Sequence, residues 1–247
     1  PFLINEITSI KTIADFRRRD VALNGQGAPL VPPFHASIFR EKAPKSVILN
    51  IGGISNVTIL GLNMTGFDTG PGNCLMDAWI MQKQNLFYDE FGEWASSGKV
   101  HQPFLKSLRD DPFFSKSPPK STGREYFNLK WAEEKFDGFK ELDEKDVQTT
   151  FCELTATTII TEIEKLASTP TEIIVCGGGR LNNYLITRLE ELGDKQISLS
   201  EEYSIDGDYI EAAAFAWLAF NNLKDLSIDW PPVTGASKSG KLGVVFG

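Results

Sequence analysis

Residues 47–60 read VILNIGGISNVTIL, and this stretch decides the fold class. An apolar run from Val47 to Ile51 is interrupted by a pair of glycines, and a second apolar run resumes at Val57. Two short apolar runs on either side of paired glycines are typical of strands joined by a tight turn. The stretch therefore predicts a β-hairpin.

Strands and helices are expected to alternate around this hairpin. Glycine-rich loops follow two of the expected strands, and apolar residues at helical spacing follow each loop. This alternation predicts an α/β protein. In chain order we expect a strand at 64–67, a helix after GFDTGPGN (66–73), short helices linked by ordered turns over 103–145, a long helix from Asp146 with an apolar face from Val147 to Leu166, a strand at 173–176, a helix after GGGRLNN (177–183), and a last helix after Asp208.

Composition excludes several classes of protein. The 247 residues include 25 Lys and Arg against 33 Asp and Glu, which gives a formal charge of −8, and 41% of the residues are hydrophobic. A core of this size disfavours disorder, and the lack of a basic stripe disfavours nucleic-acid binding. No apolar run approaches the roughly 20 residues of a membrane helix, so no membrane partner is expected.

Cysteine and histidine usage points to a reducing compartment without a metal site. The three cysteines lie in separate segments without CxxC spacing, which predicts neither a disulfide framework nor a zinc site and fits a cytoplasmic protein. The two histidines, His35 and His101, lack metal-ligand spacing and are taken as structural. We therefore predict no protein metal cage.

Three glycine-rich loops are candidate anion sites: NIGGISN from Asn50, GFDTGPGN from Gly66 and GGGRLNN from Gly177. Backbone N–H groups in such loops can approach an anion closely, and a following helix adds the positive end of its dipole. The alternative is that each loop only forms a tight turn. None of them matches the P-loop or GxGxxG pattern, which disfavours those two nucleotide sites.

Asp68 stands beside glycines at the end of an expected strand. At that position a carboxylate can project into a cleft and serve as a general base, or it can form a turn or cap a helix. Both interpretations stay open from the residues alone.

The segment DFRRRD, from Asp15 to Asp20, comes shortly before the Gly-Gln-Gly-Ala-Pro turn at 25–29. Arginine side chains beside such a turn can hold a sugar or a carboxylate ligand through paired hydrogen bonds, or the cluster can be a surface ion-pair network. The roles of Lys120, Arg124 and Glu125 in PKSTGRE are open between an anion contact and the start of a helix. Glu211, early in the last helix, either faces a cleft or favours the helix N-terminus.

Several strings, in this order, resemble the anhydro-N-acetylmuramic acid kinase family. The resemblance runs from about Ile13 to the C-terminus. The strings are DFRRRDVALNGQGAPLVPPFH, NIGGISNVT, GFDTGPGNCLMDAWI, PKSTGREYFN, DVQTTFCELTA, VCGGGRLNN and EAAAFAWLA.

The resemblance implies an actin-like ATPase fold of the ribonuclease H-like type, in which two lobes close over a nucleotide. It implies cleavage of the internal 1,6-anhydro bond of the sugar and phosphorylation of O6 from ATP, with Mg²⁺. Asp68 would be the base that activates water for attack at C1. The sugar pocket would contain Asp15, Arg17, Asp20, Gly25, Gln26, Gly27, Ala28, Pro29 and Glu211, and the nucleotide would meet Asn50, Gly52, Gly53, Asn56, Gly177, Gly178, Gly179 and Asn182.

One departure from the family is the absence of its Gly-Thr-Ser-x-Asp-Gly phosphate loop. The chain, which starts at Pro1, resembles mainly the C-terminal lobe over residues 1–232, with residues 233–247 returning toward an N-terminal lobe that is missing or is a separate chain. We therefore expect this chain alone to be inactive. The resemblance also implies a homodimer, without indicating its interface. The alternatives are a noncatalytic binding module or a kinase of the same fold for another sugar.

Overall fold

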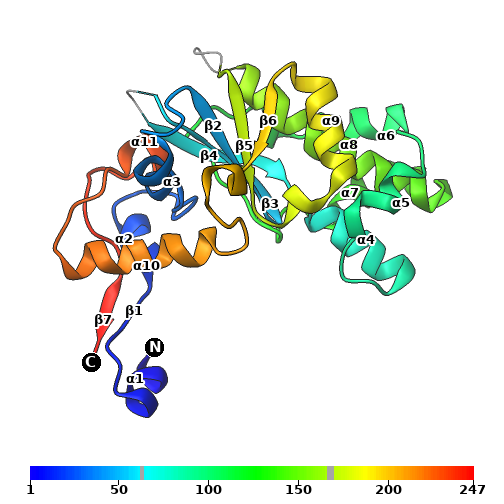
Figure 1. The fold of residues 1–247 in the computed structure, drawn as a ribbon. Coiled ribbons are helices and arrows are strands. Elements are labelled where there is room, and N and C mark those ends of the chain that lie inside the picture. The colour runs from blue at the N-terminus through cyan, green and yellow to red at the C-terminus, as the bar shows by residue number, and fades with distance from the viewer. Residues whose placement is uncertain (62–63, 166–169) are drawn as a thin grey trace.

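The computed structural model describes residues 1–61, 64–165 and 170–247, and a five-stranded sheet lies at its centre (Figure 1). The strands follow the order β4-β3-β2-β5-β6 across the sheet. β3 is antiparallel to β2 and β4, whereas β5 and β6 are parallel to β2. Their bounds are β2 Ser46–Ile51, β3 Ile54–Ile59, β4 Thr65–Pro71, β5 Glu172–Cys176 and β6 Gln196–Leu199.

This topology confirms the hairpin and the α/β class. The five strands occupy the places 3-2-1-4-5 along the sheet, and only the second of them in the chain is antiparallel to the rest. That is the ribonuclease H-like arrangement expected for a lobe of an actin-like ATPase. The parallel edge strand β6 has no counterpart among the elements expected from the sequence.

The helix α8, Glu144–Glu164, covers one face of the sheet. Asp143 caps its N-terminus, and acidic residues in the first turn favour the helix dipole. Its apolar residues form one core with the side chains of β2, β3 and β5 that point to this face. The predicted long helix is thus confirmed, although Leu166 lies outside the described residues. The same core includes residues of α4 Cys74–Gln84 and α9 Asn183–Gly193.

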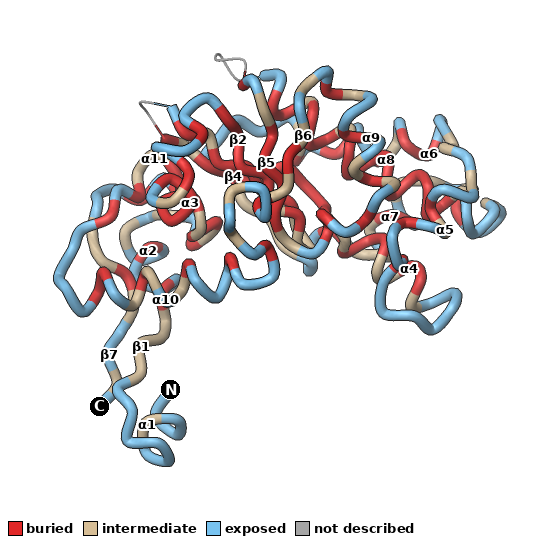
Figure 2. The backbone as a smooth tube through the Cα atoms, viewed as in Figure 1, coloured by how far each residue is buried: buried red, intermediate tan, exposed pale blue. Residues whose placement is uncertain are grey.

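Two helices cover the opposite face of the sheet. α3, Pro32–Phe39, and α10, Ile210–Leu223, pack against Ile48 of β2 and Ile174 of β5. Figure 2 shows burial concentrated in the sheet and in the helices that face it. A third core forms around the fully buried Trp230. The remaining short elements on this side are α2 Phe16–Ala22, η5 Ser200–Tyr203 and α11 Pro231–Thr234.

Between α4 and α8 the chain forms short helices, as expected for residues 103–145. Aromatic side chains such as Phe104, Phe113 and Phe127 pack edge to face and attach this region to the main core. The elements are η1 Glu90–Gly92, α5 Glu93–Ser96, α6 Gln102–Arg109, η2 Pro112–Ser115, α7 Leu129–Lys135 and η3 Phe139–Glu141.

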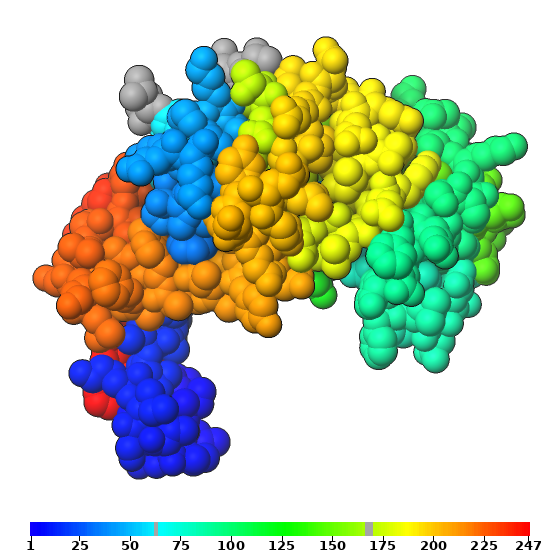
Figure 3. All heavy atoms as spheres, viewed as in Figure 1, coloured from blue at the N-terminus to red at the C-terminus, as the bar shows by residue number. Residues whose placement is uncertain are grey.

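The two ends of the chain form a projecting arm. β1, Thr12–Ala14, pairs antiparallel with β7, Val244–Phe246, and α1, Phe2–Thr8, buries no residue. Figure 3 shows this arm standing out from the body of the molecule, with a recessed surface between it and the region of α4 and α5. That residues 233–247 return toward a second lobe stays a prediction. No described helix has the length and hydropathy needed to cross a membrane.

Candidate active site

Three polar side chains lie in a row across the sheet. Asp68 of β4 is in register with Asn56 of β3, and Asn56 is in register with Asn50 of β2. Phe67 and Leu49 point into the core beneath α8. Because successive strand residues face opposite sides, Asp68 and Asn50 point to the other face, where α3 and α10 lie.

Asp68 is buried, with 4% of its surface exposed. Its Oδ2 accepts a hydrogen bond from the backbone N–H of Thr122 at 2.9 Å. Burial raises the pKa of Asp68 to about 7, although the Thr122 N–H and the cations Arg17 and Lys120 act in the opposite direction. Asn73, not Asp68, occupies the N-cap position of α4, so the capping interpretation does not hold. A carboxyl group that titrates near neutrality is suited to general-base catalysis.

A buried ion pair lies next to this carboxylate. Lys120 and Glu162 are 2% and 4% exposed, and Lys120 Nζ is 3.3 Å from Glu162 Oε2. The same Nζ lies 4.9 Å from the ring centre of Phe113, and the second carboxylate oxygen of Glu162 bonds to Lys165 at 2.6 Å. Burial lowers the pKa of Lys120, while Glu162 and Asp68 oppose that change. The carboxylates of Glu162 and Asp68 therefore favour the protonated form of Lys120, which burial disfavours.

The loop Gly25–Pro29 is held in place from within. Asp20 is fully buried, and its carboxylate accepts hydrogen bonds from the Gly27 N–H at 2.7 Å and the Thr234 hydroxyl at 2.6 Å. Arg17 Nη1 donates to the Gly27 carbonyl at 2.6 Å. Asp20 thus fixes the conformation of the loop. Arg17 also bonds to the loop, and its charge acts on Asp68 of β4.

Gln26 fastens this loop to the segment 119–125. Its Oε1 accepts hydrogen bonds from the N–H and the hydroxyl of Ser121, both at 2.9 Å, and its Nε2 donates to the Pro119 carbonyl at 3.1 Å. Because Thr122 of the same segment bonds to Asp68, the segment holds the loop and the carboxylate together.

The other residues predicted for the sugar pocket are less tightly connected. Asp15 forms an ion pair with Arg18 at 2.7 Å, as in the surface alternative for this cluster. Glu211 lies exposed in the first turn of α10. Ala28 and Pro29 continue the loop. Contacts of these residues with a sugar stay predictions.

The carbonyl groups of the Gly52–Gly53 turn accept hydrogen bonds from the backbone at the start of α4. The Gly72 and Cys74 N–H groups donate to the Gly53 carbonyl at 2.9 and 3.1 Å, and the Asn73 N–H donates to the Gly52 carbonyl at 2.8 Å. The expectation that GFDTGPGN offers these N–H groups to an anion is therefore wrong, because the turn already occupies them. Among the hydrogen bonds of the described residues, none is donated by the N–H groups of Gly52 and Gly53 themselves.

The loop after β5 continues directly into η4, Gly178–Leu181. Gly177 has a φ of 78°, and a Cβ there would lie 2.6 Å from Oδ1 of Asn50. A Cβ on Gly179 would lie 2.3 Å from the Ile51 side chain, whereas a Cβ on Gly178 would meet no atom within 4 Å. The first and third glycines are thus required for packing against the hairpin, and the second faces open space.

A cavity of about 450 Å³ opens beside this loop. Three of the predicted nucleotide residues, Gly178, Gly179 and Asn182, line it. Asn182 also caps α9, because its Oδ1 accepts from the Leu185 N–H at 2.9 Å. A wall of apolar and aromatic groups with a few polar atoms is typical of small-molecule sites. Sequence analysis missed the remaining wall. It consists of Asn73, Met76 and Asp77 at the start of α4, Tyr88, Asp89, Glu90 and Phe91 after α4, and Leu181 of η4.

We expect Gly178→Ala and Gly179→Ala to impair different properties of the protein. The methyl group of Gly179→Ala must displace Ile51, which should lower the unfolding free energy by about 1–3 kcal/mol. The methyl group of Gly178→Ala has space in the folded protein but extends toward the cavity, so it should weaken nucleotide binding with little change in stability. Urea denaturation and calorimetric nucleotide titration of both variants separate the two effects. Equal stability loss in both would contradict the assignment.

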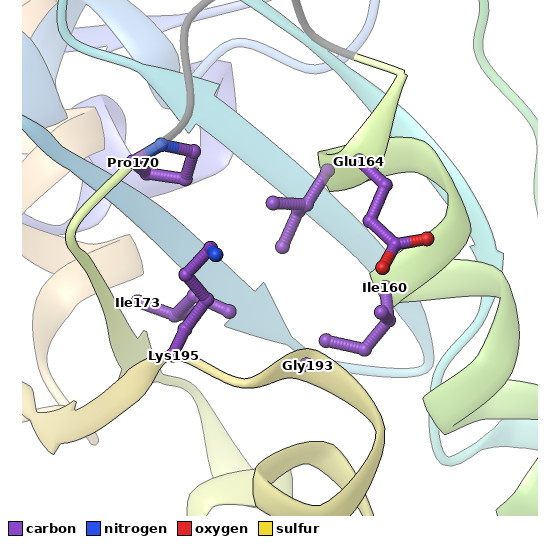
Figure 4. A pocket seen from close by; sticks show the side chains of 7 residues that line it. Ile160, Glu164, Pro170, Ile173, Gly193 and Lys195 are labelled. Carbon is purple, nitrogen blue, oxygen red and sulfur yellow. The ribbon is translucent and has the colours of Figure 1, made fainter.

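Figure 4 shows a second cavity, of about 160 Å³. It is near the start of β5 and is lined by Ile160, Ile173 and Gly193, with Glu164 and Lys195 beside it. The carboxyl end of β5, where Gly177 follows, is at the other edge of the sheet. This cavity therefore takes no part in the candidate site.

Histidine and cysteine side chains have structural contacts. His35 Nδ1 lies 2.8 Å from the Thr58 hydroxyl, and burial lowers the pKa of His35 to about 3, so the ring is neutral at pH 7. His101 caps α6 by accepting the Phe104 N–H. Burial raises the pKa of Cys74 to about 12, and all three cysteines are free and buried. Within residues 1–61, 64–165 and 170–247, no group of three or more His, Cys, Asp or Glu side chains could hold a metal ion.

The fold and the site together define an α/β protein of ribonuclease H-like arrangement, with a buried carboxylate on β4 and glycine turns after β2 and β5. The family model described as anhydro-N-acetylmuramic acid kinase matches residues 1–247. The chain belongs to this family.

Curated relatives named anhydro-N-acetylmuramic acid kinase agree with this family. The relative from Pasteurella multocida (strain Pm70) is 48% identical over 99% of this chain and 66% of its own length. Those from Shewanella sp. (strain ANA-3) and Pseudomonas fluorescens (strain Pf0-1) are 49% and 45% identical over all of this chain and 68% and 69% of theirs. The chain thus spans about two thirds of the length of these relatives.

Two solved structures are similar at a lower level. One is the activator of the 2-hydroxyisocaproyl-CoA dehydratase from Clostridium difficile with bound ADPNP, with a TM-score of 0.45 and 15% identity over 77% of this chain and 65% of that one. The other is component A of the (R)-2-hydroxyglutaryl-CoA dehydratase from Acidaminococcus fermentans, with a TM-score of 0.47 and 16% identity over 74% and 66%. Nothing about function follows from likenesses at this level.

Proposed function

We propose that the protein is an ATP-dependent kinase that hydrolyses the 1,6-anhydro bond of anhydro-N-acetylmuramic acid and phosphorylates O6, giving N-acetylmuramic acid 6-phosphate. The observation that carries the proposal is the buried Asp68, whose pKa of about 7 suits a general base and which is fastened to the loop Gly25–Pro29 through the segment 119–125. Family membership supplies the substrate and the phosphoryl donor.

The chemistry requires one base close to the anomeric carbon. Asp68 accepts a proton from a water molecule while the oxygen of that water bonds to C1. The bond between C1 and O6 breaks in the same step. Acetal hydrolysis ordinarily uses a second carboxylic acid to protonate the departing oxygen. Here O6 takes the terminal phosphoryl group of ATP instead, and ADP leaves. The products are the sugar 6-phosphate, ADP and one proton, so a single carboxylate suffices.

The nucleotide has two matching regions in this chain. The cavity beside Gly178 is large enough for an adenosine group, and Tyr88 and Phe91 on its wall offer aromatic surface to the base. The N–H groups of Gly52 and Gly53 donate none of the hydrogen bonds found among the described residues. They suit phosphate oxygens, because preorganised backbone donors stabilise developing negative charge.

The site also fits a magnesium ion that arrives with the nucleotide. Mg²⁺ usually keeps several waters and binds one or two carboxylates together with substrate phosphates, so no protein cage is needed. The half-buried Asp77 on the cavity wall would hold it. Bound there, Mg²⁺ supplies neutralisation of phosphate charge.

The test is product formation by the full-length protein. With ATP and the anhydro sugar we expect one ADP for each sugar 6-phosphate, identified by mass spectrometry. N-acetylmuramic acid, which lacks the anhydro bond, and glucose serve as matched acceptors. Faster turnover of either acceptor would favour a kinase for another sugar, and binding of neither ATP nor the anhydro sugar would reject the enzyme.

We expect kcat/KM to fall with decreasing pH along a limb centred near pH 7. A general base must be ionised to accept a proton, and Asp68 with a pKa of about 7 loses its ionised form below that pH. Well below the midpoint the rate should drop about tenfold for each pH unit. Steady-state kinetics between pH 4.5 and 9 check this. A limb centred near pH 4, the value of an ordinary aspartate at about 3.9, would contradict the role of Asp68.

A further inference from the structure

The guanidinium group of Arg124 rests on the glycine turn of the hairpin. A Cβ added to Gly53 would lie within 2.2–2.7 Å of Nε, Nη2 and Cζ of Arg124, closer than any Cβ contact in real proteins. Only glycine at this position leaves room for the guanidinium plane. The arginine therefore lies directly against the turn whose own N–H groups have no partner among the described hydrogen bonds.

Arg124 is an exposed cation that none of the ion pairs among the described residues includes. Arg124 is a nearby cation for Asp77 on the cavity wall and for Cys74, although burial still raises the pKa of both groups. The cations that act on Asp68 are Arg17 and Lys120 instead. Arg124 thus lies on the nucleotide side of the site, and Arg17 on the sugar side.

The segment that carries Arg124 also holds the base. The Lys120 carbonyl accepts a hydrogen bond from the Asp68 N–H at 3.1 Å, and the Thr122 N–H donates to the Asp68 carboxylate at 2.9 Å. Two residues further on, Arg124 reaches Gly53. Five consecutive residues therefore connect the carboxylate with the glycine turn, and the distance between these two groups is fixed by one short stretch of backbone.

We propose that Arg124 is a catalytic residue that contacts the terminal phosphoryl group of ATP as it passes to O6 of the sugar. The inference rests on the proposed function and adds a residue to it. A planar guanidinium can donate two parallel hydrogen bonds to phosphate oxygens, and together with the Gly52 and Gly53 N–H groups it forms a set of donors around one anion.

The contact has a specific consequence for the reaction. As the bond from the terminal phosphorus to the bridging oxygen of ADP breaks, negative charge spreads over the transferring group and the leaving oxygen, and the bond to O6 forms. Arg124 neutralises the charge on the transferring phosphoryl group. No proton moves to or from the arginine, because its guanidinium stays protonated throughout.

The test compares nucleotides that differ only in the terminal group. Calorimetric titration of the full-length protein with ADP and with a non-hydrolysable ATP analogue is carried out on the wild type, Arg124→Met, Arg124→Lys and the control Arg109→Met, which changes an exposed arginine on α6. We expect Arg124→Met to lose about tenfold or more in affinity for the analogue and little for ADP. Its kcat should fall at least about 10²-fold, with partial retention in Arg124→Lys and none of these losses in Arg109→Met.

A second variant disrupts the contact between Arg124 and Gly53 by changing the glycine. Gly53→Ala should reproduce the Arg124→Met losses, and the double variant should be no worse than either single one, because the alanine methyl displaces the guanidinium.

Equal affinities of wild type and Arg124→Met for the analogue, with unchanged kcat, would overturn the assignment while leaving the wild-type activity intact. A higher KM for the sugar alone would also overturn it, since Arg124 would then bind the carboxylate of the sugar. If the wild type itself forms no sugar 6-phosphate, the proposed function fails, and the assignment of Arg124 fails with it.

Discussion

The Asp68→Asn variant is expected to lose about 10²- to 10⁴-fold in kcat and to become more stable than the wild type at pH 8. Activity falls because the amide accepts no proton from water. Stability rises because the amide occupies the same buried position without a charge, and its oxygen can still accept the hydrogen bond from the Thr122 N–H.

The direction of the stability change depends on pH. The folded protein holds the pKa of Asp68 at about 7, above the unfolded value of about 3.9, so the stability that this group contributes is full below pH 4 and is lost as pH rises through 7. Above pH 7 the wild type bears a cost with an upper limit of roughly 4 kcal/mol, which the variant avoids.

Urea denaturation at pH 4.5 and pH 8 measures this difference, with Asp20→Asn as a matched control. Asp20 is also buried, but its two oxygens accept hydrogen bonds from the Gly27 N–H and the Thr234 hydroxyl, so its replacement should destabilise the protein by about 1–3 kcal/mol. If Asp68→Asn is inactive but less stable than the wild type at pH 8, the ionised carboxylate stabilises the fold. That result would contradict the raised pKa of Asp68.

Glu162→Gln is expected to destabilise the protein by about 3–5 kcal/mol near neutral pH. The substitution removes the charge that faces Lys120, which is 2% exposed and otherwise lies over the Phe113 ring. An unpaired buried ammonium has a lowered pKa, so the defect should be largest at low pH and should shrink as pH rises and Lys120 loses its proton.

Two further variants identify the buried pair as the cause. Lys165→Met removes the other, half-exposed partner of Glu162 and should change stability by less than about 1 kcal/mol. Lys120→Met combined with Glu162→Gln removes both buried charges and should recover most of the loss. Similar losses in Glu162→Gln and Lys165→Met by urea denaturation would instead assign the stabilisation to the surface pair.

Local patterns in the sequence were sufficient for four of the five strands of the sheet and for four helices. The glycine pair in VILNIGGISNVTIL predicted the hairpin, and helical spacing predicted α4, α8, α9 and α10. The edge strand β6, only four residues long, and the pairing of β1 with β7 were not predicted, because a short strand has a weak periodic signal and its partner lies far along the chain.

The arrangement of the site depended on contacts that no local pattern contains. Asp68 was singled out because it was expected beside glycines at the end of a strand. That position was wrong, because β4 continues through Asp68 to Pro71, and the place of Asp68 beside Asn56 requires a register shift between Ser55 and Asn56. Arg124 meets Gly53 across 71 residues of chain, and Asp20 turns its carboxylate inward toward Thr234. Residues so far apart in the sequence cannot be paired from local spacing patterns.

The ionisation of Asp68 tests the central claim most directly. Carbon-13 NMR of the aspartate carboxyl groups, with the Asp68 signal assigned through Asp68→Asn, follows its protonation in the full-length protein. We predict a pKa of about 7 that coincides with the acidic limb of kcat/KM. A carboxylate that stays ionised down to about pH 4, or one that titrates near 7 while the rate stays constant, would contradict its assignment as the base.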